Sequence, residues 1–98
     1  MWFIIKHSIM VVYTKHVEEK LLLPEIRKLE ISKDKIEQVL GKPEVVDKSE
    51  KPVFIAIGDL SKELSLSVVY KKIKKGLKVI IFYPAESGRY EHKVLQRG

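Results

Sequence analysis

Residues 64–84 read LSLSVVYKKIKKGLKVIIFYP, and this stretch decides the fold. Apolar residues alternate with others along 66–72 and along 77–83, and a period of two is typical of β-strands. Between the runs lies a basic segment that ends in Gly76, which can take the positive φ that a short hairpin loop needs. The sequence therefore predicts an antiparallel hairpin. Its second strand is apolar on both faces, so we expect that strand to lie inside the sheet.

The rest of the chain adds short strands and a helical region. Residues 11–13, 45–46 and 53–57 are apolar runs that indicate strands. Residues 15–40 have helical spacing, with Thr14 and Ser32 as candidate caps. Pro24 interrupts this spacing, so either one helix kinks there or a second helix begins with Pro24 in its first turn. This order predicts an α+β fold, with an antiparallel meander sheet of four to five strands and two N-terminal helices on one face.

Length and composition predict one domain spanning residues 1–98. Within it, residues 10–98 form the domain proper, and residues 1–9 are either an upstream extension or an edge strand. The absence of cysteine excludes disulfides and thiolate metal sites and fits a reducing cytoplasm. The N-terminal apolar runs are too short to span a membrane, so we expect a cytoplasmic protein without a membrane partner. Many lysines and glutamates with few amides favour a thermophilic source.

The charge balance favours an anionic partner. Nineteen Lys and Arg residues face thirteen Asp and Glu residues, which gives a net charge of +6. A basic surface of this kind attracts RNA, although it is also found on proteins that bind no nucleic acid. Candidate nucleic-acid-binding residues cluster at the predicted hairpin: Lys71, Lys72, Lys74, Lys75 and Lys78 for phosphates, with Tyr70 and Tyr83 as stacking faces. The alternative is a solvated turn whose lysines deter edge pairing.

Candidate catalytic residues lie near both ends of the chain. His16 falls where the first strand becomes a helix, where it is either a proton donor or an ordinary polar residue of the first helical turn. Arg89, Tyr90 and His92 could supply the cation, acid and base that metal-independent RNA cleavage needs, or form an exposed charged tail. There is no phosphate-binding glycine loop, nucleophile elbow or helical zinc pair, so we expect no cofactor. The three histidines are scattered, so we expect no metal.

Several segments together resemble a known family. They are VYTKH at 12–16, IS at 31–32, IEQVLGKPE at 36–44, VVY at 68–70 and GLKVIIFYP at 76–84. This pattern resembles the domain of unknown function numbered forty-two fifty-eight and is similar in order to BrnT and the RelE/ParE toxin superfamily. BrnT-like chains carry arginines on their last strands, whereas the only arginines here are Arg27, Arg89 and Arg97.

The resemblance implies a curved antiparallel sheet with two helices on one side, which cleaves mRNA, often on the ribosome, and is blocked by an antitoxin. It also places His16 at the family's histidine and Arg89–Tyr90 near its basic-aromatic end. The hypothesis is a toxin-like RNA-binding protein that acts as a metal-independent mRNA endoribonuclease of a toxin–antitoxin system. The alternatives are a non-catalytic RNA- or protein-binding module and a scaffold subunit.

Overall fold

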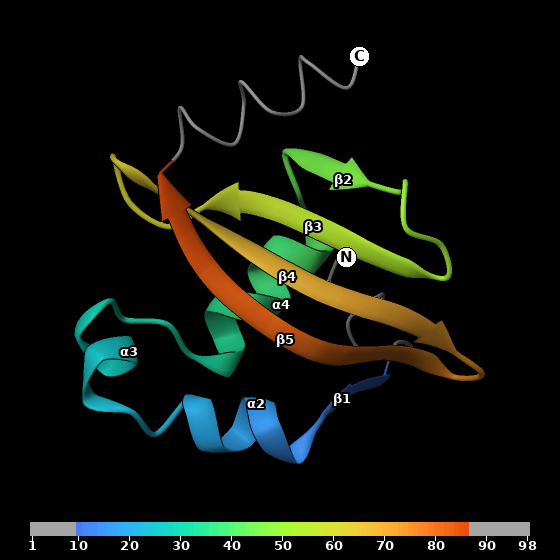
Figure 1. Ribbon diagram of the computed structural model, residues 1–98, viewed down its shortest axis with the longest axis horizontal. Helices are drawn as coiled ribbons and strands as arrows, with labels where there is room; N and C mark the ends of the chain where they lie inside the picture. The colour runs from blue at the N-terminus through green and yellow to red at the C-terminus, as the bar shows by residue number, and fades with distance from the viewer. Residues whose placement is uncertain (1–9, 87–98) are drawn as a thin grey trace, which may run out of the picture.

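The computed structural model describes residues 10–86, which form a five-stranded sheet with three helices (Figure 1). The strands are β1 (Met10–Tyr13), β2 (Val45–Asp47), β3 (Val53–Asp59), β4 (Leu64–Ile73) and β5 (Gly76–Glu86). Their order across the sheet is β1-β5-β4-β3-β2. The α+β class expected from the sequence is confirmed. Residues 1–9, expected as an extension or an edge strand, lie outside the described residues.

The predicted hairpin is confirmed, and it is longer than expected. β4 and β5 pair antiparallel from Leu64 opposite Glu86 to Ile73 opposite Gly76. A register shift between Val69 and Tyr70 interrupts the ladder, as a β-bulge does. The loop between the strands therefore consists of Lys74 and Lys75 alone. β5 lies between β1 and β4, which confirms its predicted place inside the sheet.

The prediction of a purely antiparallel sheet is wrong at β1. This strand pairs parallel with β5, from Met10 opposite Gly76 to Tyr13 opposite Val79. The helical region carries the chain from β1 at one edge of the sheet to β2 at the other. The antiparallel meander β2–β5 then returns across the sheet, and its last strand reaches β1 running in the same direction. The sheet is therefore mixed.

Three helices replace the two that were predicted. They are α2 (Lys15–Lys20), α3 (Pro24–Lys28) and α4 (Lys33–Gly41). The Thr14 hydroxyl accepts a hydrogen bond from the Val17 amide, and the Ser32 hydroxyl accepts one from the Lys35 amide, so both predicted caps are confirmed. Pro24 begins a separate helix because its missing N–H costs nothing in a first turn. No helix within residues 10–86 is long and apolar enough to cross a membrane.

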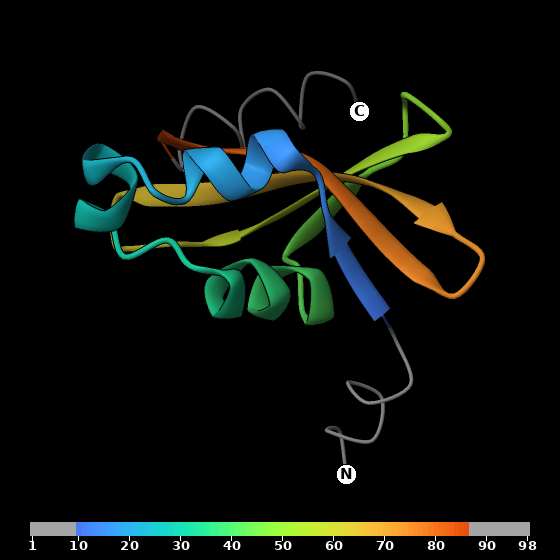
Figure 2. The same cartoon turned by 90° about the horizontal axis from the view of Figure 1, so that it is seen from below.

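All three helices contribute to one core. Figure 2 shows α4 on one side of the sheet and α2 beside β5. The core combines buried side chains of the helical region and of β3, β4 and β5: Val17, Ile26, Ile31, Ile36, Val39, Ala56, Leu66, Val68, Tyr70, Val79 and Phe82. At Gly58 an added Cβ would lie 3.2 Å from the Val39 side chain, so α4 packs closely on β3.

The edge of β5 is covered first by β1 and then by α2. The Thr14 amide donates to the Val79 carbonyl at 3.3 Å, and the Thr14 hydroxyl donates to the Ile80 carbonyl at 3.3 Å. Further along, Lys20 Nζ donates to the Phe82 carbonyl at 2.6 Å. Free strand edges promote unwanted pairing, and α2 occupies this one where β1 has ended.

Gly76 has a different role from the one predicted. Its φ lies outside the left-handed range, and the loop residues Lys74 and Lys75 also lack positive φ values. A Cβ at Gly76 would lie 1.8 Å from the Met10 carbonyl oxygen. Glycine is therefore required because the backbone of β1 passes directly over this position.

Candidate nucleic-acid interface

The hairpin end gathers all five lysines of residues 71–78, with no acidic residue in that segment. Lys71 and Lys72 close β4, Lys74 and Lys75 form the loop, and Lys78 lies on β5. The first four are exposed, and Lys78 is half-buried. We call this end of the molecule the lysine hairpin. Lys71 and Lys72 are strand residues, as the predicted strand over 66–72 implies, and the sheet fixes their directions.

Within the lysine hairpin, Lys71 and Lys78 lie directly opposite each other on neighbouring strands. Cross-strand partners share a face, and their Cβ atoms are about 5 Å apart. Like charges in this arrangement repel, and in a sheet this destabilises the pair. A phosphate between the two ammonium groups would relieve the repulsion, so the geometry favours an anion at this point.

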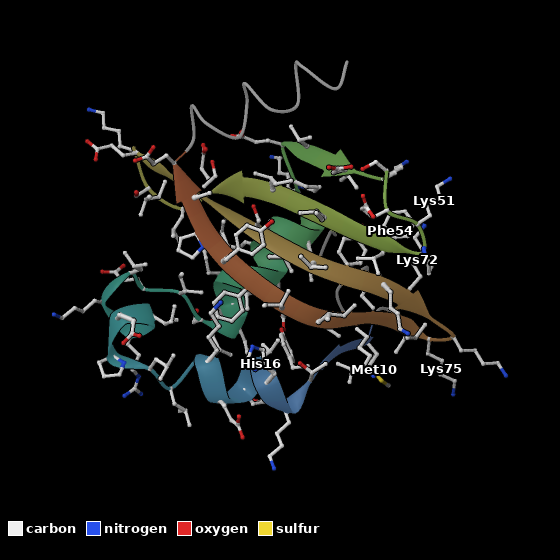
Figure 3. All side chains as sticks on the ribbon, viewed as in Figure 1. Met10, His16, Lys51, Phe54, Lys72 and Lys75 are labelled. Carbon is white, nitrogen blue, oxygen red and sulfur yellow. The ribbon has the colours of Figure 1, made fainter. Side chains whose placement is uncertain are left out.

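Phe54 joins the hairpin through β3, which sequence reasoning missed. Its ring stacks on Tyr70 with centroids 5.6 Å apart, and Lys72 Nζ lies 5.1 Å from the centroid of the Phe54 ring. Tyr70 is only 9% exposed and belongs to the core, so its ring is not presented to solvent as a stacking face. Burial also raises the pKa of the Tyr70 hydroxyl. The half-buried Phe54 is the aromatic ring over which Lys72 lies, with Lys51 close by (Figure 3).

Tyr83 is not part of the lysine hairpin. It is 39% exposed and pairs with Ser67 in the middle of β4. Five residues of extended chain separate it from Lys78, which is roughly 16 Å. A single nucleotide could not touch both side chains.

His16 is exposed on α2, away from the loop that carries Lys75 (Figure 3). It lies in the first turn of that helix, as expected. The three other predicted catalytic residues, Arg89, Tyr90 and His92, lie outside the described residues. Within residues 10–86 there is no group of three or more His, Cys, Asp or Glu side chains that could hold a metal ion.

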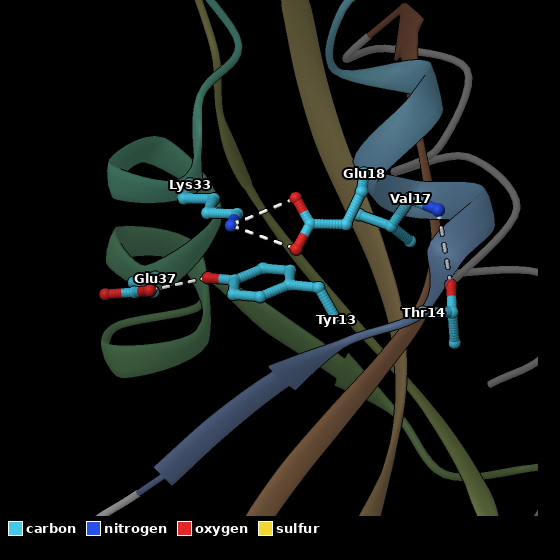
Figure 4. Close-up of polar contacts among 6 residues, drawn as sticks. All are labelled: Tyr13, Thr14, Val17, Glu18, Lys33 and Glu37. Atoms are coloured by element: carbon cyan, nitrogen blue, oxygen red, sulfur yellow. Dashed lines mark hydrogen bonds and ion pairs between the residues drawn. The ribbon is translucent and has the colours of Figure 1, made fainter.

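A polar network ties β1 to α2 and α4 (Figure 4). The Tyr13 hydroxyl donates to Glu37 of α4 at 2.5 Å. Lys33 Nζ lies 4.9 Å from the Tyr13 ring centroid and 3.0 Å from a carboxylate oxygen of Glu18. Burial and the Glu37 carboxylate raise the pKa of Tyr13 well above its ordinary value of 10. At neutral pH this hydroxyl is therefore a fixed donor, and the network holds the helices rather than moving protons.

Comparisons with the models of known protein families, with curated proteins and with solved structures gave no match for this chain.

Proposed function

We propose that the protein binds single-stranded RNA through the lysine hairpin, as a toxin-like protein of the RelE/BrnT type. The observation that carries the proposal is the direct pairing of Lys71 with Lys78, together with three more lysines at the same end of the sheet. Phosphates would lie between the paired lysines and along the loop. The RNA strand would continue round the loop to the other face of the hairpin, where a base would stack on the exposed part of the Phe54 ring, because every base has a π-face that an aromatic side chain can meet.

Salt dependence tests this proposal. Binding of a fluorescent oligouridine should weaken as sodium chloride rises, because each phosphate contact releases counterions. Replacing Lys72, Lys74 and Lys75 together with alanine should flatten the slope of log K against log salt by about 2, since each contact with a single strand contributes about 0.7. The control removes the same charge elsewhere, from the exposed residues Lys28, Lys42 and Lys62. Equal slopes in the two triple variants would refute the assignment.

We further propose that the bound RNA is cut without a metal, as in an mRNA endoribonuclease of a toxin–antitoxin system. His16 would exchange protons with His92, Arg89 would stabilise charge on phosphorus, and Tyr90 would assist. What supports this step is that His16 is exposed in the first turn of α2, directly after β1 at the edge of the sheet. The proposed endoribonuclease activity implies two partners, which are ribosome-bound mRNA and an antitoxin protein.

Cleavage in the presence of a chelator distinguishes the enzyme from a non-catalytic module. The purified protein should cut RNA in excess EDTA, and His16→Ala should lower the rate at least a hundredfold, the lower end of what general acid–base catalysis contributes. Lys15→Ala, on the preceding exposed residue, should leave the rate unchanged. Tight binding without cleavage would instead favour the module that binds RNA or a protein.

A further inference from the structure

A groove lies at the end of the molecule opposite the lysine hairpin. Its volume is about 360 Å³, and its apolar lining comes from Leu29, Leu60 and Leu64. Lys28 and Lys35 also line it, against one acidic residue, Glu30. The three leucines are half-buried, so their side chains are partly open to a ligand. We call this site the leucine groove.

Two tight turns form the walls of the leucine groove. On one side the chain reverses after α3, where Glu30 has a φ of 61° and the Ile31 amide bonds back to the Ile26 carbonyl. On the other side the amides of Leu60 and Ser61 both bond to the Leu64 carbonyl and close the β3–β4 loop. Both turns are held by backbone hydrogen bonds, so the fold fixes the backbone on the two sides of the groove.

Two exposed leucines lie in the chain just before α3, at the end of that helix away from Leu29. Leu22 and Leu23 are 69% and 42% exposed, and they are two of the four large hydrophobic residues that are exposed within residues 10–86. Leu23 precedes α3 and Leu29 follows it, so they are about 9 Å apart along the helix.

We propose that the leucine groove docks an acidic, leucine-containing segment of a protein partner. A leucine of that segment would enter the groove against Leu29, Leu60 and Leu64, while its carboxylates would pair with Lys28 and Lys35. The cavity is at the small end of the range for ligand sites, which suits one or two aliphatic side chains. RNA fits this site poorly, because within residues 10–86 the lining includes three leucines and no aromatic ring.

The position of the groove leaves the lysine hairpin free. Leu64 lines the groove at the start of β4, and Ile73 ends β4 at the hairpin. Nine steps of extended chain separate them, which is roughly 30 Å. The proposed contact is therefore separate from RNA binding and does not depend on it.

Fluorescence anisotropy with a labelled peptide of sequence Asp-Glu-Leu-Glu-Asp-Leu-Glu tests the proposal on the full chain. The double variant Lys28→Glu, Lys35→Glu should weaken binding at least tenfold. The matched variant Lys72→Glu, Lys74→Glu at the hairpin should bind as tightly as the wild type. An equal loss in both variants would mean that the peptide senses only net charge, and would overturn the proposal.

Two further measurements guard against a variant that merely fails to fold. A peptide with serine in place of both leucines should lose binding to the unchanged protein, and retained binding would contradict an apolar contact. Amide chemical shifts should move at Leu29, Leu60 and Leu64 when the peptide is added. Shifts confined to the hairpin, or shifts at the groove caused by oligouridine but not by the peptide, would refute the site.

Discussion

At the scale of single residues, Ser67 is a polar group buried at a cost to stability. It is fully buried on β4, and among the described residues its hydroxyl is the buried side-chain group without a hydrogen-bond partner. A buried hydroxyl without a partner costs about 1–3 kcal/mol of desolvation. With serine at this position, β4 is less apolar than the strands on either side of it. A small apolar residue such as alanine would fit the same space.

Ser67→Ala should therefore stabilise the protein by about 1 kcal/mol, because it removes the hydroxyl without creating a large cavity. Urea denaturation, with the midpoint compared at constant slope, measures this change. The control is Ser61→Ala, at an exposed position, which should shift the midpoint very little. A loss of stability in Ser67→Ala would mean that the hydroxyl has a partner after all.

Tyr13 makes the free energy of unfolding depend on pH in the alkaline range. The pKa of Tyr13 is higher in the folded protein than the value of 10 in the unfolded chain. Its contribution to the stability of the fold is therefore complete below pH 10 and is lost as pH rises beyond that value. The reason is that the unfolded tyrosine ionises first. Tyr13→Phe should cost about 1 kcal/mol at pH 8 through the lost bond to Glu37.

Between pH 9 and pH 11 the wild type should lose more stability than Tyr13→Phe, so the two unfolding curves should converge. Urea denaturation at several pH values measures this convergence. Tyr70 titrates in both proteins and cancels from the comparison. Parallel loss in the two proteins would show that Tyr13 ionises as easily when folded as when unfolded.

At the scale of elements, the attachment of β1 depends on one glycine. Gly76→Ala would place a methyl group 1.8 Å from the Met10 carbonyl oxygen, so β1 must move away from β5. We expect a loss of about 3 kcal/mol, as for other cases of overpacking. The hydrogen bond from the Met10 amide to the Lys75 carbonyl should break with it.

Hydrogen exchange should then show faster exchange at the β1 amides, while β3 and β4 keep their protection. Gly41→Ala provides the control, because among the described residues no atom beyond its own helix backbone and chain neighbours lies within 4 Å of the new Cβ, and the position ends a helix. That variant should be neutral or slightly stabilised. If Gly76→Ala is equally harmless, the Met10 carbonyl does not lie against position 76.

The elements that could be predicted are those fixed by local chemistry. The alternation in β4 and β5, the Thr14 and Ser32 caps and the break at Pro24 are all properties of neighbouring residues. The parallel pairing of β1 was not predictable in this way, because it depends on where the whole meander ends. Phe54 was missed for the same reason, since only the register of β3 places it opposite Tyr70.

In the candidate site, the lysines were predictable and the aromatic partner was not. Tyr70 follows Leu66 and Val68 on the same face, so its burial could have been inferred from the alternation. Its neighbours Lys71 and Lys72 point to opposite faces of the strand, which separates the lysine pair from the lysine above Phe54. Grouping the five lysines as one phosphate-binding cluster hid this division.

At the scale of the whole molecule, the positive charge is concentrated rather than spread evenly. The chain carries a net +6, and five of its sixteen lysines lie within eight residues at one end. Lys71 and Lys78 face each other, and the loop lysines extend beyond them. Concentrated charge of one sign attracts an anionic partner but destabilises the compact state by self-repulsion.

Salt should therefore act on stability and on RNA binding in opposite directions. Raising sodium chloride from 20 to 300 mM screens the repulsion between the lysines, so the melting temperature should rise by several degrees, equivalent to about 1 kcal/mol. The Lys72, Lys74 and Lys75 triple alanine variant should begin with a higher melting temperature at low salt and gain less from added salt. The Lys28, Lys42 and Lys62 variant should respond to salt much as the wild type does. A melting temperature that falls with salt in the wild type would show that exposed ion pairs such as Lys33 with Glu18 outweigh the repulsion, and that the lysine hairpin carries no strain for a phosphate to relieve.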